Sequence, residues 1–523
     1  MIKEFVGKKD KYYLIAILLL SAILVGYYIN FNDRIGISCS DVYVYLLNAL
    51  YYTGTNVHST KFIYISPPIC FLTSIFFRVG FVDKLAIYIV TGLFAIFGNV
   101  GFYLLLRKFF NEELSLTGTI LYSTFSLYLT WLANGTLDIP ATGIIIWIAL
   151  FAIIAIRENP KYYEYLIPLI AFGFFIRYTT ILTVPAFLLL YVLENGFKIN
   201  ADSRKHIKKG IIYGIIFSVI ILMPILLMGN GNFEVASQIA NGIQGTSGSE
   251  TDPAFNPDVS YYLVNFPNFI SNSNTVFEAN PVLNSPTVLS YAIFALLFVG
   301  AGFWLYGHEF KFEKKDAIAA AVILIGILSF TRTSSVVTTL LILIGMYLIG
   351  KDRECKNGIF MLGWILANAI FLSYYIVKVN RYILPTFPPF IFFILIAIEN
   401  IQKHVKINKN IIPTALIVLF VIQAFAFTAT FEPTDKYTST EEISNYIIDS
   451  NPDFENMTIG VYNIRPYSWW LGSNTIGIPS NHQSDIDKSN VSYYIANKPM
   501  DNLTNYTEIK NIANLYLYEK NTV

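Results

Sequence analysis

The segment of residues 32–83 carries polar side chains at a regular spacing within an otherwise apolar sequence. Asp41, Tyr45, Asn48 and Tyr52 follow one another at intervals of three and four residues, so on a helix they share one face. Asp41 is the only acid between Arg34 and Asp83. A carboxylate partly removed from water is a stronger base than one in water, which makes Asp41 a candidate general base. The alternative is a carboxylate that caps a helix, since Ser40-Asp41 precedes an apolar run.

Other charged groups fall at the predicted ends of apolar segments. Arg177, Arg332, Lys378 and Arg381 lie at such ends, and Asp138 lies where a short loop re-enters the apolar sequence. Guanidinium groups bind phosphate with two parallel hydrogen bonds, so this pattern favours an anion site at one membrane interface. The alternative for the basic residues is snorkelling at helix ends. A carrier would instead spread ionisable groups through the spans.

Composition defines the elements that must position these groups. The chain has 523 residues, of which 54% are hydrophobic and only 14% are charged, whereas ordinary soluble domains are about one quarter charged. The net charge of +1 excludes a strong field for nucleic acid. Cys39, Cys70 and Cys355 provide neither a disulfide framework nor a metal-binding spacing. The sequence therefore predicts a polytopic membrane protein.

Apolar stretches predict an all-α fold of about 13 transmembrane helices. The first runs from about Tyr12 to Phe31. It has basic residues before it but no cleavage site after it, so it is expected to be a membrane anchor and not a signal peptide. The region from Tyr163 to Glu194 is long for one span, and we expect two short helices that meet near Arg177. The remaining stretches centre near residues 95, 124, 148, 219, 296, 323, 342, 368, 391 and 420.

Charge asymmetry predicts the orientation of these helices. Short basic loops alternate with longer loops that are poorer in lysine and arginine, which places the N-terminus in the cytoplasm and the C-terminus outside. The predicted inner loops are Arg107-Lys108, Arg157 to Lys161, Lys198 to Lys209, Lys311 to Lys315, Lys351 to Lys356 and Lys403 to Lys409. The glycosylation sequons begin at Asn134, Asn456, Asn490, Asn502 and Asn505, all on the predicted outer side. We expect a multi-pass protein of the plasma membrane.

Two domains are expected. Residues 1–430 form the transmembrane domain, with interfacial helices in the outer loop 32–83 and a long outer loop at 230–285. Residues 431–523 form a small extracytoplasmic α/β domain, in which Glu441–Asp449 is expected to be a helix. Its expected strands are Met457–Tyr462, Val491–Ala496 and Asn514–Tyr518. Neither GxGxxG nor GxxxxGK[ST] occurs in the sequence, so no nucleotide loop is predicted.

Several of these features occur together in one known family. They are Asp41 after the first span, Ser66-Pro67-Pro68 at the start of a second interfacial helix, Asp138 at the start of the fourth span, and Lys378-Val-Asn-Arg381-Tyr382-Ile-Leu-Pro385 followed by Pro388-Pro389. Over most of residues 12–430 the chain resembles the C-type glycosyltransferases. Within them it is most similar to the dolichyl-phosphate-mannose protein mannosyltransferase-like group, which includes lipid A aminoarabinose transferases.

The resemblance implies transfer of a sugar from a polyprenyl-phosphate-linked donor, with inversion, to a protein, lipid or glycan acceptor at the outer face. It implies that Asp41 is the base and that Asp138 is a second acid that orients the acceptor or Asp41. Arg381 and Lys378 match the cations that hold the lipid phosphate. Further candidate contacts to the substrate are Arg177, Tyr45, Asn48 and Tyr382. Membrane lipids are the remaining expected partners, and nucleic acid is not one.

The sequence departs from the family at two positions. Many relatives carry an Asp-Glu pair in the first loop, where this chain has the single carboxylate of Asp41, and many carry a lysine where this chain has Ser66.

No cofactor is predicted with certainty, and a divalent metal is left undecided, with His58 as a candidate ligand. Trp469-Trp470-Leu471-Gly472 is similar to the oligosaccharyltransferase Trp-Trp-Asp-Tyr-Gly motif but lacks its Asp and Tyr. The alternative functions are a lipid-linked-saccharide carrier or flippase and an oligosaccharyltransferase-like enzyme.

Overall fold

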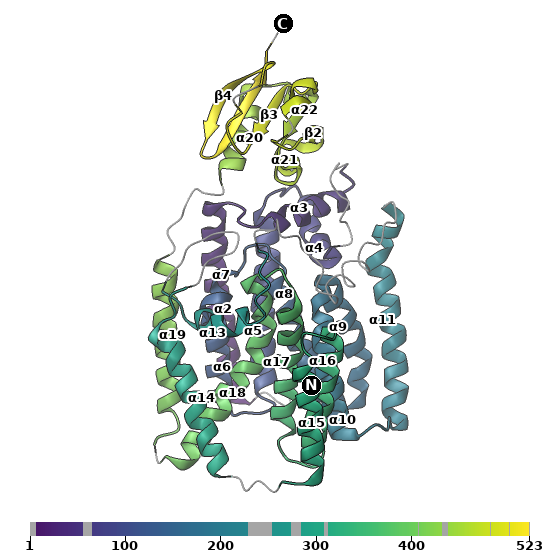
Figure 1. The fold of residues 1–523 in the computed structure, drawn as a ribbon, viewed down its shortest axis with the longest axis vertical. Helices are drawn as coiled ribbons and strands as arrows, with labels where there is room; N and C mark the ends of the chain where they lie inside the picture. The colour runs from purple at the N-terminus through teal and green to yellow at the C-terminus, as the bar shows by residue number, and fades with distance from the viewer. Residues whose placement is uncertain are drawn as a thin grey trace. The chain divides into compact units, whose positions relative to one another are not determined.

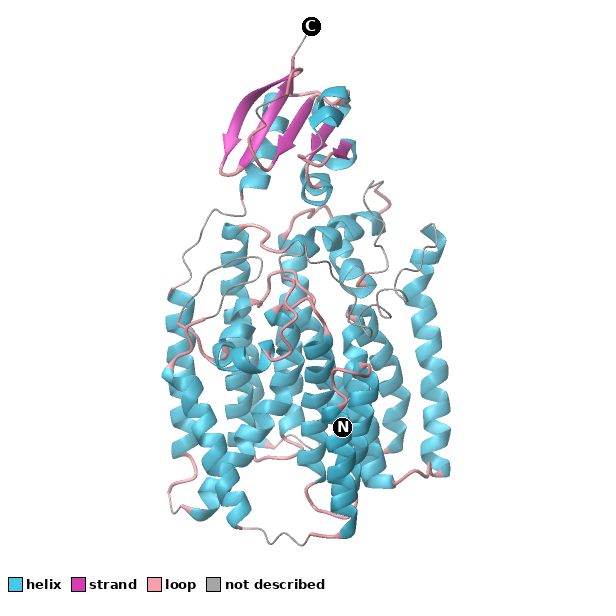
Figure 2. Cartoon of the chain, viewed as in Figure 1, coloured by secondary structure: helices cyan, strands magenta, loops and turns pink. Residues whose placement is uncertain are grey.

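The computed structural model describes residues 7–55, 65–228, 254–273, 284–307, 312–405, 407–430, 438–481, 483–500 and 503–521. Helices make up most of these ranges, and the strands that Figure 2 draws in magenta all lie after residue 438. The helices of the apolar part are α2 (Lys8–Ile35), α3 (Ser40–Tyr52), α4 (Pro67–Arg78), α5 (Leu85–Leu106), α6 (Glu112–Thr124), α7 (Ser126–Thr130), α8 (Asp138–Arg157), α9 (Tyr163–Ile176), α10 (Val184–Asn195), α11 (Ala201–Met228), α13 (Tyr261–Ile270), α14 (Val288–Tyr306), α15 (Lys314–Leu328), α16 (Ser335–Gly350), α17 (Lys356–Tyr374), α18 (Phe387–His404) and α19 (Ile411–Ala429). The chain is an α-helical polytopic membrane protein with a small C-terminal α/β part.

Each of the 13 predicted membrane segments contains a helix. Within the described ranges, nine helical segments are both long and apolar enough to cross a membrane. The other four, α6, α9, α15 and α16, have 13 to 16 residues. At 1.5 Å per residue such helices extend about 20–24 Å, which is less than a hydrocarbon core of about 30 Å. The number of complete spans therefore stays a prediction.

Two other predictions concern helix boundaries. The region around Arg177 does contain two short helices, because α9 ends at Ile176 and α10 begins at Val184. Within the predicted outer loop 230–285, the described residues include the helix α13. His58 and Asn502 lie outside the described residues.

The chain divides into two compact units. The first comprises Met1–Val25, Leu93–Leu132 and Leu137–Phe431, and the second comprises Gly26–Gly92, Ala133–Thr136 and Glu432–Val523. The helices α3 and α4 of the first loop thus belong to the same unit as the C-terminal α/β part (Figure 1).

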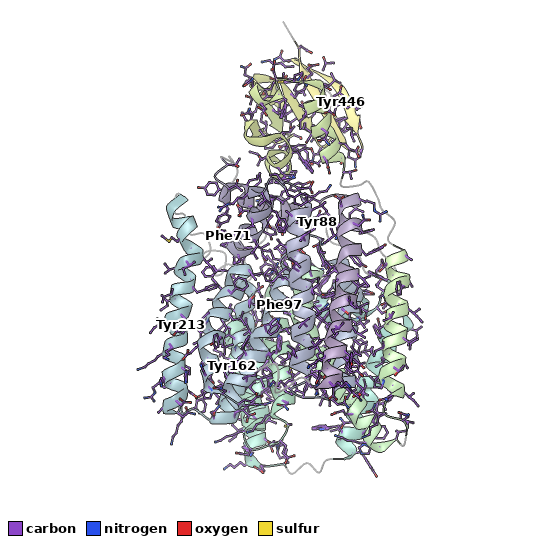
Figure 3. The ribbon with its side chains drawn as sticks, turned by 180° about the vertical axis from the view of Figure 1, so that it is seen from behind. Phe71, Tyr88, Phe97, Tyr162, Tyr213 and Tyr446 are labelled. Atoms are coloured by element: carbon purple, nitrogen blue, oxygen red, sulfur yellow. The ribbon has the colours of Figure 1, made fainter. Side chains whose placement is uncertain are left out.

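Helices of the first unit approach each other closely where their side chains are small. A Cβ atom added at Gly98 of α5 would lie 2.9 Å from the Cα of Gly143 in α8, so these two helices meet at glycine. Beside this contact, Phe97 stacks on Trp147 with ring centroids 4.5 Å apart (Phe97 is labelled in Figure 3). The close packing fixes α8, whose first residue is Asp138.

Basic loops of the first unit share one end, where ion pairs connect them. Arg107 after α5 binds Asp10 at the start of α2, and Lys108 binds Glu158 at the end of α8. The other pairs at this end are Arg157–Glu194, Lys356–Glu194, Lys315–Asp352 and Arg353–Asp316. Four of the six loops that the sequence predicts on the inner side are therefore joined by contacts of this kind.

The C-terminal α/β part forms a five-stranded sheet of order β2-β1-β3-β5-β4. Its elements are α20 (Ser439–Ser450), β1 (Ile459–Val461), α21 (Ile464–Leu471), β2 (Thr475–Gly477), α22 (Gln483–Lys488), β3 (Tyr493–Ala496), β4 (Tyr506–Ile512) and β5 (Leu515–Lys520). β1 pairs in parallel with β2 and β3, while β5 is antiparallel to β3 and β4. Ile443 and Ile447 of α20 pack against Val461, Ile495 and Leu517 of the sheet.

Candidate active site

Three charged side chains from distant segments of the first unit meet in a buried cluster. The Oδ2 atom of Asp138 lies 3.0 Å from the Nη1 atom of Arg177 and 3.2 Å from the Nε atom of Arg381. The exposed fractions of the three side chains are 3%, 17% and 7%. Two guanidinium groups thus share one carboxylate oxygen, and the three groups together carry a net charge of +1. Such a cluster can accept an anion.

Each of the three residues stands at the end of a helical element. Asp138 opens α8, where the positive end of the helix dipole favours a carboxylate. Arg177 directly follows α9 and has extended backbone angles, which end that helix. Arg381 is the second residue of the 3-10 helix Asn380–Thr386, which continues into α18 through Pro385, Pro388 and Pro389. Helix breaks therefore bring the charged groups together.

Aromatic rings hold the guanidinium groups in place. Arg381 lies 4.9 Å from the ring centroid of Trp131 and 5.8 Å from that of Tyr382, and Arg177 lies 4.9 Å from the Tyr382 ring. The indole N–H of Trp131 donates to the side-chain oxygen of Asn380 at 3.0 Å. Cation–π contacts of this kind are worth about 2 kcal/mol when they are desolvated. Tyr382 is among the residues expected from the sequence, whereas Trp131 and Asn380 are not; their only signal in the sequence is their closeness to Asp138 and Arg381 along the chain.

Lys378 has a different environment from the two arginines. Its ammonium is buried and donates to the carbonyl oxygens of Leu372 and Ser373, at 2.7 and 2.9 Å, at the end of α17. The ring of Tyr262 lies 5.7 Å from Nζ. Burial lowers the pKa of Lys378 to about 8, and the charge of Asp258 opposes this shift. Lys378 thus caps a helix, and a phosphate would have to compete with two carbonyl groups for its ammonium.

The first-loop residues lie together on a helix of the second unit. α3 extends over Ser40–Tyr52, so Asp41, Tyr45 and Asn48 share one face as predicted. Asp41 is half-buried, whereas Tyr45 and Asn48 are buried. The N-cap of α3 is Cys39, so Asp41 lies in the first turn and is not the capping residue.

The Pro-Pro segment begins the next helix as predicted. Pro67 and Pro68 occupy the first positions of α4, where a missing N–H costs nothing. Ser66 precedes them with φ 48° and ψ 53°, a left-handed conformation that reverses the chain before the helix. Within the described ranges, no three His, Cys, Asp or Glu side chains are grouped as they would be to hold a metal ion.

Comparisons with known proteins show which family and which structures the chain is similar to. Residues 66–227, which include Asp138 and Arg177, match the family model described as dolichyl-phosphate-mannose-protein mannosyltransferase. The structure is similar to that of ArnT from Cupriavidus metallidurans bound to undecaprenyl phosphate, with a TM-score of 0.61 and 11% sequence identity over 97% of both chains. The apo form of the same protein has a TM-score of 0.60 and 10% identity over 96% of this chain and 97% of that one. No curated protein matches the sequence at a significant level.

An oligosaccharyltransferase from Archaeoglobus fulgidus, in its apo form, also resembles the structure, with 12% identity over 94% of this chain and 70% of that one. Its TM-score is 0.48, which is too low to bear on function.

The fold is that of a polytopic membrane protein similar to ArnT, and residues 66–227 match a glycosyltransferase family model. The match over residues 66–227 supports the resemblance inferred from the sequence to the dolichyl-phosphate-mannose protein mannosyltransferase-like group, and the fold is similar to that of ArnT. This result favours the enzyme over the non-enzymatic carrier.

Proposed function

We propose that the protein transfers a sugar from a polyprenyl-phosphate donor to an acceptor hydroxyl, with inversion, at the outer face of the plasma membrane. The observation that carries the proposal is the buried cluster of Asp138, Arg177 and Arg381. Its two guanidinium groups are held by aromatic rings, and its net positive charge suits a phosphate that gains negative charge as it leaves. The match of residues 66–227 to the mannosyltransferase family model supports the same donor class.

In the proposed reaction the acceptor oxygen attacks the anomeric carbon and displaces the lipid phosphate. Asp41 takes the proton of the acceptor hydroxyl, and the electron pair of the broken bond leaves with the phosphate. Arg177 and Arg381 stabilise the phosphate, because charge-assisted hydrogen bonds to guanidinium groups are strong in a site that excludes water. Tyr45 and Asn48 are proposed to contact the substrate from the same helical face as Asp41.

The contacts of Asp138 support a role different from that of a second acid acting on the acceptor. Its carboxylate binds both arginines, so we assign it the role of orienting them. Lys378 is proposed to act in the same way, by fixing the segment between α17 and Arg381 through the carbonyl groups of Leu372 and Ser373.

A transfer assay tests the proposal. Wild type, Asp41→Asn and Arg381→Met are purified in lipid nanodiscs and given radiolabelled polyprenyl-phosphate sugars, with membrane extract as the acceptor. Loss of a general base lowers the rate by about 10²- to 10⁴-fold, so Asp41→Asn is expected to bind the donor but to transfer it slowly. Arg381→Met is expected to lose affinity for the donor.

The matched control is Asp453→Asn, because Asp453 is an exposed acid of the C-terminal α/β part. It is expected to keep wild-type activity. Undiminished transfer by Asp41→Asn would remove this residue from the role of base, and wild-type affinity in Arg381→Met would remove Arg381 from the donor site.

The proposed orientation is tested separately. A membrane-impermeant thiol reagent, applied to cells that carry single-cysteine variants, is expected to label Lys488→Cys in the C-terminal part but not Lys205→Cys at the start of α11. Labelling of residue 205 from outside would refute transfer at the outer face.

A further inference from the structure

Lys84 is a buried lysine that lies between two carboxylates of the second unit. Its Nζ atom is 2.9 Å from the Oε2 atom of Glu441 and 3.4 Å from the Oδ1 atom of Asp33. Only 7% of the residue is exposed. Asp33 belongs to the last turns of α2, Lys84 directly precedes α5, and Glu441 lies in the first turn of α20. One ammonium group therefore connects the first loop to the C-terminal α/β part.

Two tryptophans of α21 contact the first-loop region, one of them beside this ion pair. The ring of Trp470 lies 5.8 Å from the Nζ atom of Lys84. Its neighbour Trp469 packs against Phe77 of α4, with ring centroids 5.8 Å apart. The tryptophan pair therefore contacts the first-loop region of the protein itself. A pair that only packed onto the membrane surface would not need these protein contacts.

Tyr43 extends these contacts to the helix that carries Asp41. Tyr43 is 95% buried and lies two residues after Asp41 on α3, a helix that packs against α21. Burial raises the pKa of Tyr43; a hydrogen bond from Trp470 opposes this shift, and the charge of Glu441 adds to it. Glu441 therefore acts both on Lys84 and on a buried side chain of α3, the helix that carries Asp41.

α3 depends on such packing for its position. It has 13 residues, and its N-cap Cys39 makes no side-chain capping hydrogen bond. Isolated helices of this length are marginal in water, so the contacts of its buried face must hold it in place. A loss of those contacts would loosen the first turn, where Asp41 is located.

We propose that Lys84 is a positioning residue, which fixes α20 and α21 against α3 and α4 and thereby holds Asp41 in the geometry for proton transfer. The inference rests on the proposed function for its catalytic part, while the contact itself is independent of it. A misplacement of about 1 Å in a catalytic group costs about 100-fold in rate. Loss of the Lys84 contact is therefore expected to lower kcat and to leave the KM for the donor nearly unchanged.

The test compares Lys84→Met with the charge exchange Lys84→Glu/Glu441→Lys. The exchange retains two carboxylates and one ammonium group in the same place. Hydrogen exchange of full-length protein in nanodiscs is measured for residues 42–52, together with kcat and KM for transfer from a polyprenyl-phosphate sugar. Lys84→Met is expected to raise the exchange rate of α3 at least tenfold and to lower kcat about 100-fold, and the charge exchange is expected to recover at least a tenth of wild-type kcat.

The matched control is Lys315→Met in the first unit. Lys315 also binds two carboxylates, those of Glu313 and Asp352, but it has no part in the second unit. This variant is expected to leave the exchange of α3 and the value of kcat unchanged. If Lys84→Met does not fold, Glu441→Gln removes the same ion pair from the other side and keeps the lysine.

The outcomes separate the two parts of the inference. Unchanged exchange of α3 in both single variants would overturn the contact. Faster exchange with kcat within twofold of wild type would overturn positioning and leave Lys84 with a purely structural role. A wild-type protein that transfers no sugar would refute the proposed function and with it the catalytic part, while the exchange of α3 would still decide the contact.

Discussion

The asymmetry of the buried charge cluster predicts that Asp138→Asn destabilises the protein more than the loss of an arginine does. Asp138 is the carboxylate that both arginines share, and its side chain is 3% exposed. Its replacement leaves two buried guanidinium groups without that carboxylate. Replacement of Arg177 instead leaves one carboxylate paired with Arg381 and brings the net charge of the three positions from +1 to zero.

The expected magnitudes follow from these contacts. Breaking a buried ion pair so that charge remains uncompensated costs about 3–5 kcal/mol, which is the expected loss for Asp138→Asn. Arg177→Met leaves Asp138 paired with Arg381, so its expected loss is smaller, about 2 kcal/mol, which is the value of the desolvated cation–π contact with Tyr382. In the double variant, removal of one cation relieves the other, and the total loss is expected to be smaller than the sum of the single losses.

Unfolding in mixed micelles at increasing SDS, followed by tryptophan fluorescence, measures these free energies. Asp202→Asn is the control, since this acid is 65% exposed and lies 3.5 Å from His206 at the other end of the first unit. It is expected to change the free energy of unfolding by less than about 0.5 kcal/mol. Equal losses for Asp138→Asn and Arg177→Met, or additive losses in the double variant, would refute the shared-carboxylate reasoning.

Three further predictions concern single residues. The pKa of Lys378 is about 8 in the folded protein and about 10.4 in the unfolded chain, so between these pH values the unfolded chain binds more protons. The free energy of unfolding should therefore rise with pH across this window. SDS unfolding of Lys378→Met should not show this rise. Gly135 has φ +83° and an added Cβ would lie 2.9 Å from Val42, so Gly135→Ala should cost about 1–3 kcal/mol by the same assay, and a neutral result would contradict the strain. Asn134 is 4% exposed, and its side-chain oxygen accepts hydrogen bonds from both the N–H and the hydroxyl of Thr136. Mass spectrometry should therefore find Asn134 unglycosylated in any host. A glycan at this residue would show that the loop opens.

The sequence predicts most of the helical framework because apolar runs and proline positions are local signals. The start of α4 at Pro67 and the break at Arg177 are both visible in this way. The strand β4 is missed because its residues are mostly exposed at the sheet edge and show no alternation. The strand β2 has only three residues, one of them a glycine.

The candidate site is predicted by residue type but not by role. Asp138, Arg177 and Arg381 are identified from charge in apolar surroundings, yet their common contact depends on helix packing between distant segments. The interpretation of Lys378 as a phosphate ligand comes from its place in a motif. Its two carbonyl partners at the end of α17 become visible only when the chain turns back after Tyr374.

The ion pair between Lys84 and Glu441 joins residues that are 357 positions apart in the sequence. A ribosome adds about 5–20 residues per second, so Glu441 is synthesised about 20–70 s after Lys84. During this interval α3 and α4 have been made, but α20 and α21 have not. The first loop therefore has no packing partners from the C-terminal part until α20 and α21 have been synthesised. A protein truncated before residue 438 would lack these partners permanently.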